Sequence, residues 1–169
     1  MGVTIHFEGK LNSEGSYSTL LESVRNFAAR QGWPAEDLPE AERSLKRVRD
    51  DQNWDYVGLT KGLLVYPHDD CEPLSFEFDE NFFIQQYCKT QFAGAKVHTA
   101  IVGLLRSLQP LFATLKVEDE GEYWDSSDEP TLVGHMESID AQIARLVVEK
   151  PNCRVAVRLP SLRIVDVIY

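Results

Sequence analysis

The chain is poor in cysteine and has no long hydrophobic run. Its 169 residues include three cysteines, which form no CxxC pair and match no zinc-binding spacing: Cys71, Cys88 and Cys153. Three such thiols fit reduced cysteines better than a disulfide scaffold. No apolar stretch approaches the ~20 residues of a membrane-spanning helix, and the first residues lack the basic start and apolar core of a signal peptide. We therefore expect a soluble, cytoplasmic protein without a membrane partner.

Basic residues and phosphate-binding motifs are scarce as well. A total of 17 Lys and Arg residues against 27 Asp and Glu residues gives a net charge of −10. Nucleic acids are bound largely through Lys and Arg that replace counterions at the phosphates, so we expect no nucleic-acid partner. The chain contains no GxxxxGK, GxGxxG or GxSxG motif. The motifs therefore identify no cofactor and no catalytic residue, and they leave open whether the protein is an enzyme.

The acidic charge is concentrated in blocks. Seven acidic residues and no basic one fall within residues 118–129, which we call the acidic segment. Two adjacent aromatic residues, Tyr123 and Trp124, lie inside it, and such residues are favoured as anchors of protein interfaces. The charges of residues 89–116, in contrast, are all basic. Either these blocks neutralise each other within the fold, or they form a polarised surface that steers a charged partner.

Alternation of apolar and polar residues predicts the strands. It is clearest from Val3 to Glu8 and from Leu74 to Asp79. Residues 34–42 are acidic and contain proline, which predicts a loop. The predicted strands cover residues 3–8, 44–49, 56–66, 74–79, 154–159 and 162–169.

Apolar residues at helical spacing predict three helices, over residues 17–28, 97–112 and 132–147. In the first helix, Leu20, Val24 and Phe27 share one face and are expected to be buried against the sheet. Gly32 is expected to end that helix, and Asp128 to cap the third one. Pro110 interrupts the second helix, where a kink or a restart is expected.

The order of these elements predicts the fold class. Because the strands are grouped and are not separated singly by helices, a doubly wound parallel sheet is disfavoured. We expect an α+β fold with a mixed or mainly antiparallel sheet and two to four helices packed mostly on one face. The length favours one globular domain spanning residues 1–169.

The main functional hypothesis is a non-catalytic interaction module that presents an acidic face to a basic partner protein. The absence of catalytic motifs, the charge blocks and the aromatic pair all favour this interpretation. The residues expected to bind the partner are Glu118, Asp119, Glu120, Glu122, Tyr123 and Trp124.

Two alternatives stay open. A metal-dependent hydrolase would use His68, Asp69 and Asp70, which lie in one predicted loop, together with carboxylates of residues 118–122. A small-molecule-binding domain would instead have a pocket between sheet and helices. His98 and His135 border the apolar faces of their helices, and we expect them to be hydrogen-bonded residues of the fold.

Overall fold

Eight strands and four α-helices follow one another within residues 2–169, the part of the chain that this computed structural model describes. In chain order they are β1 (Thr4–Leu11), α1 (Glu14–Gln31), β2 (Ala35–Arg49), β3 (Gln52–Val65), β4 (Leu74–Asp79), β5 (Phe83–Lys89), α2 (Ala95–Leu108), a 3-10 turn (Gln109–Leu111), β6 (Phe112–Asp119), α3 (Tyr123–Ser126), α4 (Glu129–Glu149), β7 (Arg154–Arg158) and β8 (Ile164–Ile168).

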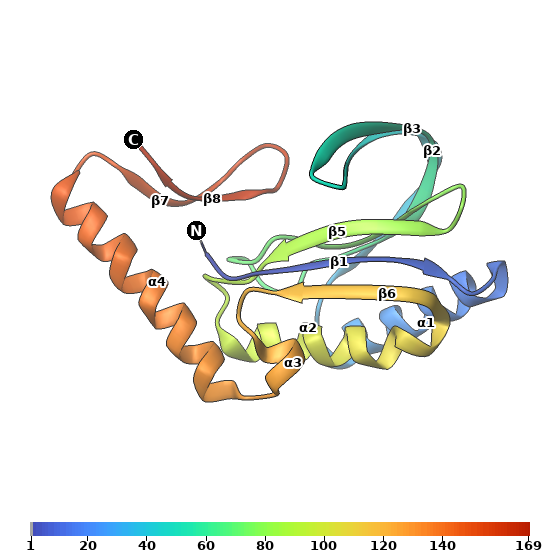
Figure 1. The fold of residues 1–169 in the computed structure, drawn as a ribbon, viewed down its shortest axis with the longest axis horizontal. Coiled ribbons are helices and arrows are strands. Elements are labelled where there is room, and N and C mark those ends of the chain that lie inside the picture. Colours follow the sequence, from blue (N-terminus) through green and yellow to red (C-terminus); the bar gives the residue numbers. More distant parts are fainter. Residues whose placement is uncertain (1) are drawn as a thin grey trace.

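All strand pairs among the described residues are antiparallel, in three sheets ordered β5-β1-β6, β2-β3-β4 and β7-β8. Helices α1 and α2 lie together on one side of the β5-β1-β6 sheet (Figure 1). The predicted α+β class with antiparallel sheets is therefore confirmed.

The core lies between the two helices and the inner faces of this sheet and of strands β3 and β4. Ile5 and Phe7 of β1 point into it, and Leu20 and Val24 of α1 are fully buried there, as predicted. Phe27 is only partly buried, against Trp33 at a ring-centroid distance of 5.5 Å. The alternation of β1 leaves its other side chains on the opposite face, which no helix covers (Figure 1).

The helix ends follow local chemistry. Gly32 has a φ of 71° and ends α1 in the left-handed conformation, as predicted. The Asp128 carboxylate accepts the backbone N–H of Thr131 and caps α4, also as predicted. The predicted second helix is too long, because α2 ends at Leu108 and a 3-10 turn containing Pro110 leads into strand β6.

The predicted loop over residues 34–42 is wrong. Residues 35–42 belong to β2, a strand of 15 residues that pairs with β3 from Ala35 to Arg49 and that includes the strand predicted over residues 44–49. Residues 35–42 are mostly exposed, so their sequence lacks the alternation of a half-buried strand. The distal part of the β2–β3 hairpin, residues 43–58, curls over the open face of the central sheet (Figure 1), and we call it the hook.

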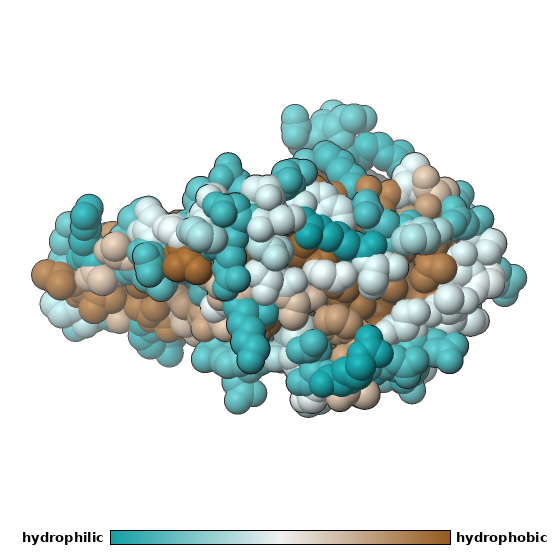
Figure 2. Space-filling model, turned by 90° about the horizontal axis from the view of Figure 1, so that it is seen from below, coloured by the Kyte–Doolittle hydropathy of each residue, from teal (hydrophilic) through white to brown (hydrophobic). Residues whose placement is uncertain are grey.

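Helix α4 and the β7–β8 hairpin form a narrow end of the molecule. Near its start, α4 packs Leu132 and Met136 against Val3. Towards its C-terminus Val148 is 82% exposed, and hydrophobic residues continue along this end in the view from below (Figure 2). No helix within residues 2–169 is long and apolar enough to span a membrane.

Candidate binding cleft

A cleft of about 1580 Å³ lies between the hook and the open face of the central sheet. Side chains of β1, β5 and β6 form its floor, the hook forms its roof, and the β7–β8 turn at residues 161–163 closes one side. Small-molecule sites usually occupy ~300–1,000 Å³. The cleft is therefore large enough for a segment of a macromolecule.

The floor is polar because the register places alternate residues of three strands in rows. His6 of β1 lies between Tyr87 of β5 and Glu118 of β6. In the next row, Glu8 lies between Gln85 and Lys116. The same strand thus buries Ile5 and Phe7 on one face and presents His6 and Glu8 to the cleft on the other. The floor residues of these two rows all carry hydrogen-bonding groups: His6, Glu8, Gln85, Tyr87, Lys116 and Glu118.

The side chain of Gln85 fastens the hook to this floor. Its Oε1 accepts the backbone N–H of Val48 at 2.7 Å, and its Nε2 donates to the Val48 carbonyl oxygen at 2.8 Å. The same Nε2 donates to Glu8 Oε2 at 2.8 Å. The amide group therefore pairs with the hook backbone as a neighbouring strand would, and it connects the roof to both β5 and β1.

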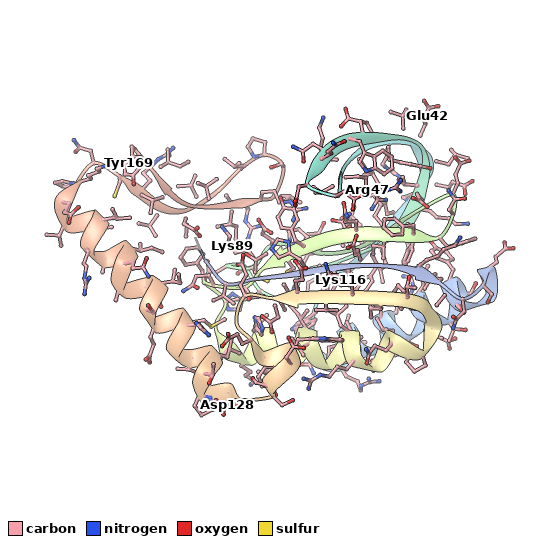
Figure 3. The ribbon with its side chains drawn as sticks, viewed as in Figure 1. Glu42, Arg47, Lys89, Lys116, Asp128 and Tyr169 are labelled. Carbon is pink, nitrogen blue, oxygen red and sulfur yellow. The ribbon has the colours of Figure 1, made fainter. Side chains whose placement is uncertain are left out.

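Arg47 lies inside the curl of the hook, whereas Glu42 points away from it on the outer side (Figure 3). The Arg47 side chain is only 1% exposed, and its Nη2 lies 3.7 Å from Asp79 Oδ2. Its guanidinium lies over the ring of Phe83, and the distance from Arg47 Cζ to the ring centroid is 5.2 Å. Burial lowers the pKa of Arg47, and the charge of Asp79 opposes this effect. Nε and Nη2 have no hydrogen-bond partner among the described residues.

Most other cations of the cleft are already engaged within the chain. Lys46 pairs with Asp55 at 2.7 Å and Lys116 with Glu118 at 2.6 Å. Arg163 pairs with Glu72 at 3.1 Å and stacks on the ring of Tyr87, with a separation of 3.7 Å. These ion pairs engage three cations of the walls and floor. Arg49 of the hook also lines the cleft, forms no ion pair among the described residues, and lies 5.4 Å from the centre of the Trp54 ring.

Four carboxylates of the cleft, in contrast, form no ion pair with any described residue: Glu8, Asp50, Asp51 and Glu77. Glu8 accepts from the neutral amide of Gln85, and Glu77 accepts from the Thr60 hydroxyl at 2.6 Å. Asp50 and Asp51 form the tip of the hook, with φ values of 49° and 61°. The uncompensated charge of the cleft is therefore negative.

The acidic segment has a different arrangement. The Asp119 side chain is fully buried and accepts three hydrogen bonds, from His98 Nε2 at 3.0 Å, Trp124 N at 2.8 Å and Gly121 N at 2.7 Å. Burial alone raises the pKa of this carboxyl, but the hydrogen bond and charge of His98 and the backbone N–H groups outweigh it and lower the pKa. His98 Nδ1 lies 2.8 Å from Thr90 Oγ1. Asp119 is thus an internal anchor of the fold.

The other predicted acids lie near partners that come from distant parts of the chain. Glu120 Oε1 lies 3.7 Å from His6 Nε2, and Glu122 Oε2 accepts from His135 Nε2 at 2.9 Å. Of the six predicted binding residues, Glu118 alone lines the cleft.

The aromatic pair of the acidic segment is partly buried. Tyr123 and Trp124 pack against the core, and the Arg106 guanidinium lies 5.6 Å from the centre of each ring. Arg106 also donates to both backbone carbonyl oxygens. These contacts fix the short helix α3 against α2, and they leave only part of the Trp124 ring for a partner.

The predicted metal ligands lie in the exposed loop between β3 and β4. His68 Nδ1 accepts the backbone N–H of Asp70 at 3.0 Å, an interaction that organises the turn, and Asp69 is exposed. Within residues 2–169, no three His, Cys, Asp or Glu side chains gather where they can hold a metal ion. The geometry therefore gives no support to the metal-dependent alternative.

Comparisons with known proteins leave the cleft as the principal guide to function. No family model, no curated protein and no solved structure matches this chain.

Proposed function

We propose that this protein is a non-catalytic binding module that holds a basic segment of a partner protein in the hook cleft. The observation that carries the proposal is the charge imbalance of the cleft. Lys46, Lys116 and Arg163 are paired within the chain, whereas the four carboxylates named above are not. A lysine- or arginine-rich segment would supply the missing cations.

The exposed aromatic residues of the cleft support a polypeptide as the occupant. Trp54 is 38% exposed on the hook, and Tyr87 is 40% exposed on the floor. Exposed ion pairs contribute little affinity by themselves, so a tight complex needs buried aromatic or arginine anchors. Trp54 and Tyr87 provide such anchors on both sides of the cleft.

The long-range field of the chain agrees with this partner. The net charge of −10 attracts cationic proteins and increases their rate of encounter, and salt screens the attraction. In this proposal the net negative charge of the chain steers the partner, and the cleft holds it.

The test is a titration with a labelled lysine- and arginine-rich peptide, followed by fluorescence anisotropy. A peptide of equal length with glutamate at the basic positions is the control ligand. We expect the cationic peptide alone to bind, more weakly as salt rises. The variant D50N/D51N should weaken binding about two- to thirtyfold, since each exposed ion pair contributes ~0.2–1 kcal/mol. Asparagine tolerates the positive φ at both positions.

A matched variant separates site binding from net charge. Glu22 on α1 and Glu137 on α4 are exposed and form no ion pair among the described residues. E22Q/E137Q removes the same charge as D50N/D51N, far from the hook tip in the chain. Equal weakening by both double variants would show attraction to overall charge without a site. Equal affinity for the two peptides would exclude a basic partner segment.

A further inference from the structure

Two thiols face each other in the interior, away from the cleft carboxylates. The Sγ atoms of Cys71 and Cys88 are 3.6 Å apart. Cys71 is 2% exposed in the loop that precedes β4, and Cys88 is fully buried on β5. The spacing of these cysteines in the sequence does not reveal their contact, which depends on how the loop lies along the strand.

The backbone holds the two thiols together. Glu72 N donates to the Lys89 carbonyl oxygen at 3.2 Å, so the loop runs beside the end of β5. Cys88 Sγ lies 3.2 Å from the Glu72 carbonyl oxygen, and Cys71 Sγ lies 3.5 Å from that of Lys89. The two sulfur atoms of a disulfide are ~2.05 Å apart, so the Sγ atoms must approach each other by about 1.5 Å. Side-chain rotation and a small loop shift supply such a movement.

We propose that Cys71 and Cys88 form a modification site that a disulfide oxidant of the glutathione class converts to an intramolecular disulfide. Cys71 loses its proton and attacks one sulfur of glutathione disulfide, which forms a mixed disulfide and releases one glutathione thiolate. Cys88 then loses its proton and attacks the Cys71 sulfur, which releases the second glutathione. Two S–H bonds are lost, one S–S bond forms, and the oxidant is reduced to two thiols.

Cys71 is the entry point because of its position in the loop. Cys88 lies in a strand paired with β1 opposite Ile5, whereas Cys71 becomes accessible when the loop opens locally. The hydrogen bond between the two thiols and burial raise the pKa of the Cys88 thiol well above its ordinary value. Cys88 therefore stays protonated and unreactive until the mixed disulfide at Cys71 brings the leaving group next to it.

The bond would fasten the loop that holds the β7–β8 hairpin. Glu72, the neighbour of Cys71, accepts from Arg163 Nη1 at 3.1 Å and from Ile164 N at 2.9 Å. Arg163 in turn walls the cleft. Oxidation is thus expected to stabilise this wall, and the inference holds whether or not the cleft binds a basic segment.

The experiment counts free thiols. The folded protein is incubated with glutathione disulfide, acidified, unfolded and alkylated, and its intact mass is measured. Reduced protein has three alkylated cysteines. We expect one after oxidation, at Cys153, with a Cys71–Cys88 peptide pair in a digest. C153S should still form the bond, and C71S should not. The melting temperature should rise on oxidation, return with dithiothreitol, and not rise in C71S.

A second experiment does not depend on whether the oxidant can reach the buried thiols of the folded protein. The protein is refolded from denaturant in a glutathione redox buffer, so that both thiols meet the oxidant before burial. Three free thiols, a persistent glutathione adduct at Cys71, or a bond to Cys153 after this treatment would each overturn the proposal. Formation of the Cys71–Cys88 bond during refolding alone supports the site and assigns its slow reaction in the folded state to burial.

Discussion

In the acidic segment, four carboxylates contact a histidine or lysine, whereas in the hook cleft four carboxylates form no ion pair among the described residues. Both regions are rich in acids in the sequence. The difference arises because β1, β6, α2 and α4 bring His6, Lys116, His98 and His135 to the acidic segment. A block of like charge along the chain therefore does not identify the charge that is available to a partner.

The largest effect is expected from Asp119, because its charge is buried. D119A removes the acceptor of three hydrogen bonds and leaves His98 and two backbone N–H groups without it. Breaking a buried pair costs about 3–5 kcal/mol. E120A breaks only the exposed contact to His6 and should cost less than ~1 kcal/mol. Urea unfolding measures both, and similar losses would contradict the distinction between anchor and surface.

The same anchor should make the fold sensitive to acid. The pKa of Asp119 is lower in the folded protein than its ordinary value of about 3.9. Its contribution to stability is therefore fully present above that value and is lost as pH falls through the folded pKa. Urea unfolding at a series of acidic pH values should show this loss. D119N should unfold with a shallower acid dependence, and an unchanged profile would remove Asp119 from this role.

How far these features follow from the sequence depends on what surrounds each segment. Strand β1 and helix α1 were predictable because one face of each meets the core and the other meets water. Strand β2 was predicted only over residues 44–49, since residues 35–42 are mostly exposed and contain Pro39 and four acidic residues, a composition typical of loops. Strand β6 was hidden by the apolar stripe that continues across Pro110 to Phe112.

The cleft itself was not predictable from the acidic segment. Its roof and floor join residues far apart in the chain, such as Gln85 and Val48. The available signals were Trp54 and the adjacent pair Asp50 and Asp51, which lie between two β-prone runs at the position of a hairpin turn. The interpretation of His98 as a hydrogen-bonded residue of the fold agrees with its contacts to Thr90 and Asp119.

Two tryptophans test which acidic region binds. Trp124 packs against the core beneath Arg106, so W124A should lower stability by about 1–3 kcal/mol. Trp54 lies at the exposed hook beside Arg49, so W54A should change stability little. The variant should weaken binding of the cationic peptide about tenfold, as loss of an interface anchor does. Thermal melts and anisotropy separate the two effects. If W124A weakens peptide binding and W54A does not, the binding site lies in the acidic segment and not in the hook cleft.

A smaller effect is expected from the contact that fastens the hook. Q85A removes the side-chain bonds to Val48 and Glu8 and should cost about 1–2 kcal/mol. Hydrogen exchange at the Val48 amide should accelerate, because this N–H loses its acceptor. Gln86, the next residue, makes no side-chain hydrogen bond to described residues, so Q86A is the control. Unchanged protection of Val48 in Q85A would mean that the roof does not depend on Gln85.

The smallest change in stability concerns the tip of the hook and should have the opposite sign. Asp50 and Asp51 both have positive φ, as the two central residues of a type I′ hairpin turn require, and Asn-Gly is the preferred pair there. D50N/D51G places residues that favour positive φ at both positions and should stabilise the protein by about 0.5–1 kcal/mol.

The same double variant removes two carboxylates from the mouth of the cleft and should weaken binding of the cationic peptide. Stability and binding would then change in opposite directions, as expected where residues are retained for function at a conformational cost. Urea unfolding and anisotropy on one sample measure both. D50N/D51N is the control, since it removes the charge without glycine. If D50N/D51G stabilises the protein and binds the peptide undiminished, the tip serves the turn alone and does not form part of the binding site.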